Sequence, residues 1–231
     1  MKIVVFVSCS KSKKLSHPNQ PKCRELNAKY LREKYIEIYQ EKRPAKDLYI
    51  GPNNLSTNSA VKILREFFDV KYYIVSAGFG ILDENDLAPP YDCSFSDMTK
   101  EEIINRAKLL EIPDDYRRII TTEKPDLIYL GLGKNYLQAL GKWDFNLPCK
   151  TIAFEPSQNK NVISLPADNI AVKETAAVSA LPIHGVIGFK GDLLLLSSNY
   201  LKNQKNPEEA LKELLEKPED FLYLINTLRI I

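Results

Sequence analysis

Apolar runs typical of β-strands alternate with helical segments along the first two thirds of the chain. The strongest runs are KIVVFVSC at 2–9, VKYYIVSAG at 70–78, PDLIYLGLG at 125–133 and CKTIAFEP at 149–156. A helix between two such strands returns the chain to the same starting edge, so that consecutive strands run parallel. The pattern therefore predicts an α/β fold, with a mostly parallel sheet and helices on both faces.

The segments between these runs have apolar spacings or capping residues typical of helices. A shorter strand, DLYIG, is predicted at 47–51. In the helix predicted near 96–111, either Ser96 or Thr99 could be the cap, and Thr99 has Glu102 three residues later. Helices are predicted at 23–42, 55–68, 96–111, 113–124 and 134–140.

The character of the chain changes after Pro156. Residues 157–169 are polar and rich in turn formers, which predicts a loop. Helical patterns follow at 188–204 and from Asn206 onward, with a break near Pro218. We therefore expect an α/β core domain of residues 1–156 and a helical C-terminal extension of residues 157–231 packed on that core.

Composition excludes few classes of function. The 231 residues suffice for a sizeable core, and the net charge of +2 is too balanced to indicate nucleic-acid binding by itself. The N-terminal segment lacks the pattern of a signal peptide, and no apolar run is long enough to span a membrane. We expect a cytoplasmic protein with no membrane partner.

Histidine and cysteine are too sparse for a metal centre of the usual spacing. The chain has two histidines, His17 and His184, so a Ser-His-Asp triad would need one of them. The four cysteines are far apart and form no CxxC pair, which argues against a zinc site and against a disulfide framework. We expect no metal and no cofactor.

The first strand is followed by an unusual turn of hydroxyls and lysines. In open α/β sheets, ligands bind outside the carboxyl ends of the strands. Hydroxyls and backbone amides can hold an anion there, with lysine adding charge, although the P-loop pattern is absent. The alternative is a solvated basic turn. The residues concerned are Ser8, Cys9, Ser10, Lys11, Ser12 and Lys13.

A long segment, 76–95, follows the strand at 70–78. Gly78 and Gly80 would let the backbone approach a ligand closely, and the aromatic Tyr91 follows a stiff pair of prolines. A loop of this length between a strand and a helix is more often functional than idle. The alternative is a polar connection with a helix cap. The carboxylates of the segment 76–95 are Asp83, Glu84, Asp86 and Asp92.

A third strand end has Gly131 and Gly133 before a predicted helix, whose amides would favour an anion. Tight packing between the strand and the helix explains these glycines equally well. If the sheet is parallel, all three segments emerge at one edge and form one site.

These motifs resemble a widespread YaaA-like domain family, over roughly residues 1–156. Members of that family have SCSKSK or a close variant after the first strand, then SAxxGxL leading to PYD, then GxxY. In this chain the first motif is at 8–13. The later motifs are represented by Ser76, Ala77, Gly80, Leu82, Pro90, Tyr91, Asp92, Gly133 and Tyr136.

The chain is more remotely similar to the core domain of archaeosine synthase, which joins lysine to a deazaguanine nitrile in transfer RNA. The similarity rests on Cys9, Ser10, Lys13, Gly80, Glu84, Tyr91 and Asp92. The chain departs from that family at Lys14–Leu15, where the family has Pro-Tyr. The resemblance implies a uracil-DNA-glycosylase-like, three-layer α/β arrangement with a pocket for a base or nucleotide.

The first functional hypothesis is an enzyme acting on a nucleobase or nucleotide, free or in nucleic acid, by modifying the base or processing an N-glycoside. Lys13 would be a nucleophile or electrostatic stabiliser, and Asp92 or Glu84 would contact a base edge or transfer a proton. Tyr91 would stack on the base. Cys9 could be a nucleophile, or a small buried side chain. The remaining ligand-binding candidates are Ser8, Ser10, Lys11, Ser12, Ser76, Gly78, Gly80, Gly133 and Tyr136.

The alternative is a non-catalytic, YaaA-like protein of the stress response that binds DNA or RNA. The basic segments 11–14 and 33–46 would then contact phosphates. A third hypothesis is a domain that only senses a ligand. Convergence of Lys13, Ser76 and Asp92 on one pocket would favour the enzyme, whereas basic residues spread along an open face would favour the binding protein.

Overall fold

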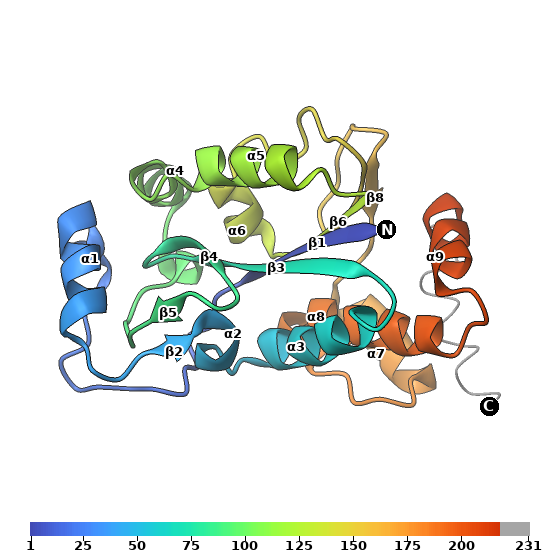
Figure 1. The fold of residues 1–231 in the computed structure, drawn as a ribbon, viewed down its shortest axis with the longest axis horizontal. Helices are drawn as coiled ribbons and strands as arrows, with labels where there is room; N and C mark the ends of the chain where they lie inside the picture. Colours follow the sequence, from blue (N-terminus) through green and yellow to red (C-terminus); the bar gives the residue numbers. More distant parts are fainter. Residues whose placement is uncertain (218–231) are drawn as a thin grey trace.

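The computed structural model describes residues 1–217 of the chain. Within these residues one sheet has the strand order β4-β3-β1-β6-β7-β8 (Figure 1). Its neighbouring strands pair in parallel, apart from β3 and β4. The predicted α/β fold with a mostly parallel sheet is confirmed. The strands are β1 Lys2–Ser8, β3 Asp69–Ser76, β4 Gly80–Asp83, β6 Leu127–Gly131, β7 Lys150–Ala153 and β8 Val162–Ser164; β2 Arg43–Pro44 and β5 Leu87–Ala88 form a small antiparallel pair.

Helices cover both faces of the sheet (Figure 1). Helices α4, α5 and α6 lie on one side, and α3, α7 and α8 lie on the other. The α-helices are α1 Lys29–Ile38, α2 Ala45–Leu48, α3 Pro52–Leu64, α4 Lys100–Leu109, α5 Ile112–Glu123, α6 Lys134–Ala139, α7 Asn169–Val178, α8 Gly185–Lys202 and α9 Pro207–Glu216; short 3₁₀ helices are η1 Cys23–Leu26 and η2 Phe95–Asp97.

Strand β1 is the centre of the core. It is paired on both edges, and Val5 lies opposite Tyr72 of β3 and Tyr129 of β6. The ring of Phe6 meets the ring of Tyr116 on α5 at 5.3 Å, edge to face. A strand covered on both faces buries nearly every side chain, which explains its unbroken apolar sequence.

Two predicted elements differ from the structure near this core. The strand predicted at 47–51 is instead the helical turn α2, followed by a single bridge between Tyr49 and Lys13. The helix predicted at 23–42 is divided into η1 and α1. Within the described residues α1 has no fully buried side chain, and its partly buried Tyr35 packs against the core.

The segment after β3 is a hairpin rather than a long open loop. Ser76 pairs with Gly80, and the chain returns antiparallel as β4. Gly80 has a φ of +84°, a backbone conformation that favours glycine because it has no Cβ. The predicted role of Gly80 in close approach to a ligand is therefore replaced by a role in this turn.

Residues 157–217 complete the same body. Strand β8, within the predicted loop, extends the sheet beyond β7, so this part of the chain is not solely helical. Helix α8 lies alongside α3 in the same direction: a Cβ at Gly191 would overlap the Asn53 carbonyl oxygen, and Lys202 forms an ion pair with Glu66. The helix predicted beyond Pro218 lies outside the described residues.

A disulfide joins Cys23 to Cys93, across 70 residues. The expectation of no disulfide framework is therefore wrong for this pair, because the fold brings η1 against the segment before η2. Among residues 1–217, none of the helices combines the length and apolar character needed to cross a bilayer.

Candidate functional site

The carboxyl ends of β1, β3 and β6 meet at one edge of the sheet, as the parallel pairing requires. The amide of Cys9 donates to the carbonyl of Val75, which joins the first two strand ends. Two side chains at the start of α3 form hydrogen bonds with the ends of β1 and β6. The side-chain amide of Asn54 donates to the Ser8 carbonyl at 2.9 Å, and that of Asn53 donates to the Gly131 carbonyl at 3.0 Å.

A buried chain of three hydroxyls lies at this edge. The Tyr91 hydroxyl is 2.8 Å from the Ser76 hydroxyl and 2.8 Å from the Tyr49 hydroxyl. The Ser76 oxygen also accepts from the amides of Gly78 and Phe79. Three hydroxyls have three protons for two links, so one proton of the chain is left to donate elsewhere.

Lys13 lies directly above this chain. Its Nζ is 4.1 Å from the centre of the Tyr91 ring and donates to the Ser10 carbonyl at 3.1 Å. Burial lowers the pKa of Lys13, and the nearby Cys9 and Asp92 act in the opposite direction. A lysine held in this way has more of the neutral, nucleophilic amine than an exposed lysine has.

Cys9 connects the first strand end with the third. Its Sγ is 3.2 Å from the Tyr136 hydroxyl, which also lies 3.3 Å from the Cys9 carbonyl. Both side chains are buried. Burial raises the pKa of Tyr136 well above its ordinary value, and the Cys9 thiol adds to the effect. Tyr136 therefore stays a neutral phenol and is a hydrogen-bonding partner of the thiol.

The two tyrosines of the hydroxyl chain are neutral for the same reason. Burial, and secondly Cys9, raise the pKa of Tyr49 and of Tyr91 above the ordinary phenol range. We define the candidate site by the residues that the structure brings together here. They are Cys9, Lys13, Tyr49, Ser76, Tyr91 and Tyr136.

The Ser10 hydroxyl of the first turn is used within the protein. The Ser10 oxygen accepts from the Gly51 amide at 3.2 Å and donates to the Ser12 carbonyl at 2.5 Å. The Ser12 carbonyl also accepts from the amide of Ile50. The exposed Lys11 forms an ion pair with Asp97 at 2.7 Å. These contacts shape the turn, so the predicted anion cradle is not formed by the Ser10 hydroxyl.

Tyr91 does not offer a face for stacking. Its exposed fraction is 1%, Lys13 lies over its ring, and Phe79 meets the ring edge to face at 5.1 Å. A Cβ at Gly78 would be 2.7 Å from a Tyr91 ring carbon, so this glycine is needed for the tyrosine to fit. The predicted stacking role is replaced by positioning of Lys13.

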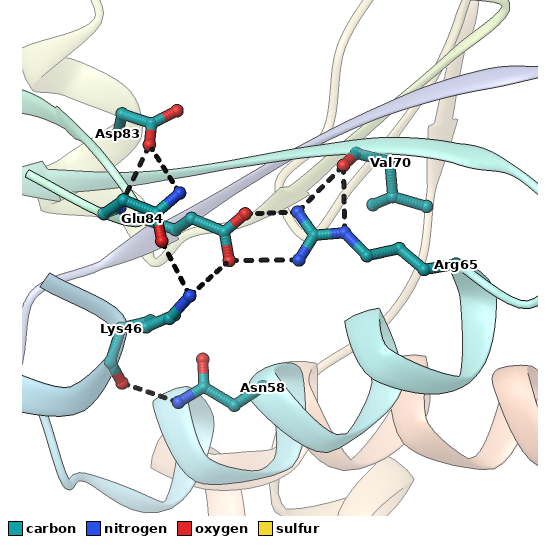
Figure 2. A network of polar contacts seen from close by, with 7 residues as sticks. Lys46, Asn58, Arg65, Val70, Asp83 and Glu84 are labelled. Carbon is teal, nitrogen blue, oxygen red and sulfur yellow. Dashed lines mark hydrogen bonds and ion pairs between the residues drawn. The ribbon is translucent and has the colours of Figure 1, made fainter. Parts of the chain in front are cut away.

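Glu84 lies outside the candidate site (Figure 2). Its carboxylate is paired with both terminal nitrogens of Arg65 and lies 3.7 Å from the Nζ of Lys46. The Glu84 amide donates to the Tyr72 carbonyl, four residues before the end of β3. Four strand residues span about 13 Å. The structure therefore places Glu84 away from the carboxyl end of β3 and pairs it with Arg65, which follows α3.

Asp92 is exposed beside the candidate site. Its amide donates to the Pro21 carbonyl, and its backbone forms a bridge with Lys22. It does not cap the next helix, because Ser94 caps η2. A surface depression of about 550 Å³ is lined by Lys22, Asp92, Ser94 and Asp97, among other residues. Asp92 is thus exposed at this depression, and Lys13, whose pKa it raises, is not among the residues that line it.

The third strand end contributes Tyr136 to the candidate site. Gly133 begins α6, and a Cβ there would meet nothing within 4 Å, so close packing does not require this glycine. Sequence patterns missed Tyr49, because it lies within the strand wrongly predicted at 47–51, and missed Asn53 and Asn54, which show no special spacing. Within residues 1–217, no group of three His, Cys, Asp or Glu side chains could hold a metal ion.

Comparisons with protein-family models, with curated proteins and with solved structures find no match for this chain.

Proposed function

We propose that the protein is an enzyme that acts on a nucleobase or nucleotide, either free or within a nucleic acid. The observation that carries this proposal is the position of Lys13, with its amine over the Tyr91 ring and its pKa lowered by burial. A desolvated lysine is a common nucleophile in enzymes. It lies at the carboxyl edge of a parallel sheet, where such folds bind ligands.

The neighbouring groups suit this chemistry. The exposed carboxylate of Asp92 can accept a hydrogen bond from the amino group of a base or transfer a proton. In an N-glycoside reaction, the Lys13 amine would attack the anomeric carbon while the bond to the base breaks. Lys13 would lose one proton, and the departing base would gain one. The hydroxyl chain below Lys13 holds Tyr91, and hence Lys13, in a fixed position.

The resemblance to the YaaA-like and archaeosine synthase families supports the same substrate class. Both similarities include Lys13, Tyr91 and Asp92, which meet at or beside the candidate site. The uracil-DNA-glycosylase-like arrangement that the resemblance implies remains part of this proposal.

The experiment is a substrate panel with product analysis by mass spectrometry. Purified protein is incubated with nucleosides, nucleotides and single- and double-stranded oligonucleotides, and released or modified bases are measured. We expect turnover of at least one of these, lost in Lys13→Met. The matched control is Lys14→Met, because Lys14 is the adjacent, exposed lysine of the same turn. Turnover that survives Lys13→Met would contradict the assignment.

A second candidate function, nucleic-acid binding without catalysis, is favoured by a different observation. Residues 22–46 contain eight lysines and arginines against four glutamates, a net charge of +4. Helix α1 lies in this segment, and Tyr30 on it has an exposed fraction of 68%. An open basic surface of this kind can bind phosphates.

Binding measurements separate the two candidates. If the protein only binds nucleic acid, Lys34→Glu with Lys42→Glu should weaken the binding of an oligonucleotide and reduce its dependence on salt, and Lys13→Met should have no effect. If the protein is an enzyme, Lys13→Met should abolish turnover whatever its effect on binding.

A further inference from the structure

A second polar cluster lies at the same edge of the sheet, at the start of α8. Gly188 lies so close to α3 that a Cβ on it would be 2.9 Å from the Cβ of Pro52 and 2.5 Å from that of His184. Pro52 follows Gly51, whose amide bonds to the Ser10 hydroxyl. The start of α3 therefore lies between His184 and the turn that contains Lys13.

The cluster is built around one buried carboxylate. Asp192, with an exposed fraction of 2%, accepts three hydrogen bonds. Its Oδ1 accepts from the Ser56 hydroxyl at 2.6 Å and lies 2.9 Å from the Nδ1 of His184, and its Oδ2 accepts from the His184 amide at 2.7 Å. A carboxylate with three donors is well satisfied in the interior.

This arrangement determines which nitrogen of His184 has the proton. A carboxylate can only accept, so Nδ1 of the imidazole must donate to it. The Nε2 of the neutral ring is then an acceptor. The side chain of His184 has an exposed fraction of 46%, and its Nδ1 faces buried Asp192, so Nε2 is on the solvent side. The Ser56 donor is the one of the three that joins α3 to α8, so the imidazole of His184 does not contribute to that link.

We infer that His184, oriented by Asp192, is the proton acceptor of the proposed enzyme. The inference rests on the proposed function. In the step that it assists, which follows the attack by Lys13, an O–H bond of a water breaks and its proton forms an N–H bond at Nε2. The water oxygen bonds to the anomeric carbon, and the bond from that carbon to the Lys13 nitrogen breaks. The Asp192 carboxylate stabilises the resulting imidazolium, and the proton later leaves with the departing group. Asp192 is a positioning residue.

The first test needs no substrate. Diethyl pyrocarbonate modifies the free nitrogen of imidazole, and the chain has only one other histidine, the exposed His17, which is an internal reference. We expect His184 to react several-fold faster than His17, by peptide mass spectrometry, and Asp192→Asn to remove this difference. Equal rates, or a difference that survives Asp192→Asn with an unchanged melting temperature, would overturn the inference.

The second test uses a substrate from the panel. His184→Asn retains an N–H donor for Asp192 but has no second ring nitrogen. It should preserve the melting temperature and reduce turnover at least a hundredfold. In His184→Ala, added imidazole should restore part of the turnover, which a merely structural role would not produce. Full activity of His184→Asn would overturn the inference.

The two proposals can fail separately. If the wild-type protein converts none of the panel, the proposed function fails, and the carbethoxylation rates still decide whether His184 is an activated base. If the wild-type protein is active, Lys13→Met is inactive and His184→Asn is unaffected, only the inference about His184 fails.

Discussion

The Nζ of Lys13 lies 4.1 Å from the centre of the Tyr91 ring, although 77 residues separate the two in the chain. The ring supplies a cation–π contact to an amine that has lost much of its water. The hydroxyl of the same ring is held by Tyr49 and Ser76. The Lys13 amine is therefore positioned by a ring whose hydroxyl is itself held by two hydrogen bonds.

The lowered pKa of Lys13 predicts how stability depends on pH. Its folded pKa is below the ordinary value of 10.5, so protonated Lys13 destabilises the fold at neutral pH. That penalty is fully present below the folded pKa and disappears as pH rises toward 10.5. In urea unfolding at pH 7, we expect the free energy of unfolding of Lys13→Met to be at least as large as that of the wild type. By pH 10, the free energy of unfolding of the wild type should have risen relative to that of Lys13→Met. The opposite trend would contradict the burial of this amine.

The hydrogen bonds of the hydroxyl chain predict that removing the Tyr91 hydroxyl destabilises the fold more than removing the Tyr49 hydroxyl. Tyr91 makes two hydroxyl contacts and Tyr49 makes one. Tyr91→Phe removes the hydroxyl that links Tyr49 to Ser76, which keeps the amides of Gly78 and Phe79, and should cost about 1–3 kcal/mol of the free energy of unfolding. Tyr49→Phe, the matched control, should cost less. Equal costs would indicate that the Ser76 contact contributes nothing.

Glu84 is expected to matter for stability and not for turnover. Glu84→Gln replaces the ion pair with Arg65 and Lys46 by weaker hydrogen bonds. The free energy of unfolding should fall by on the order of 1–3 kcal/mol, because hydrogen bonds to a charged group are lost while both cations are partly exposed. Activity on the panel should be unchanged. Loss of turnover at preserved stability would instead indicate that Glu84 takes part in catalysis.

Two glycines should respond differently to alanine. At Gly191 a Cβ would overlap the backbone of Asn53 and force α8 away from α3, which should cost about 1–3 kcal/mol. At Gly133 a Cβ meets open space. Thermal unfolding should therefore show a lower melting temperature for Gly191→Ala and little change for Gly133→Ala. A stable Gly191→Ala would mean that the two helices can separate without cost.

The disulfide predicts a large effect of reduction. A cross-link across 70 residues limits the unfolded chain, and the loop-entropy model gives about 4 kcal/mol for this length. Cys23→Ser with Cys93→Ser should lower the free energy of unfolding by up to this amount, and dithiothreitol should change only the wild type. Equal stability of the oxidised and reduced wild-type protein would contradict this role.

Local patterns determined the main strands and helices of this fold, although not α2 or β8. The apolar run of β1 predicts a strand buried on both faces, and Thr99 with Glu102 predicts the start of α4, where the structure has a capping box. Parallel pairing also follows from strand–helix alternation, and it brings Ser8, Ser76 and Gly131 to one edge. These features depend on residues a few positions apart, whose periodicity and backbone preferences are visible in the sequence.

Only the tertiary structure decided which side chains meet at that edge. Tyr91 is bonded to Tyr49 instead of facing a ligand, Glu84 is paired with Arg65, and His184 is held by Asp192. The sequence contains these residues but not their partners. Each contact depends on how whole helices and strands pack, and packing joins segments whose separation in the chain has no period. The sequence therefore shows which residue types the site contains, but it does not show how they are arranged.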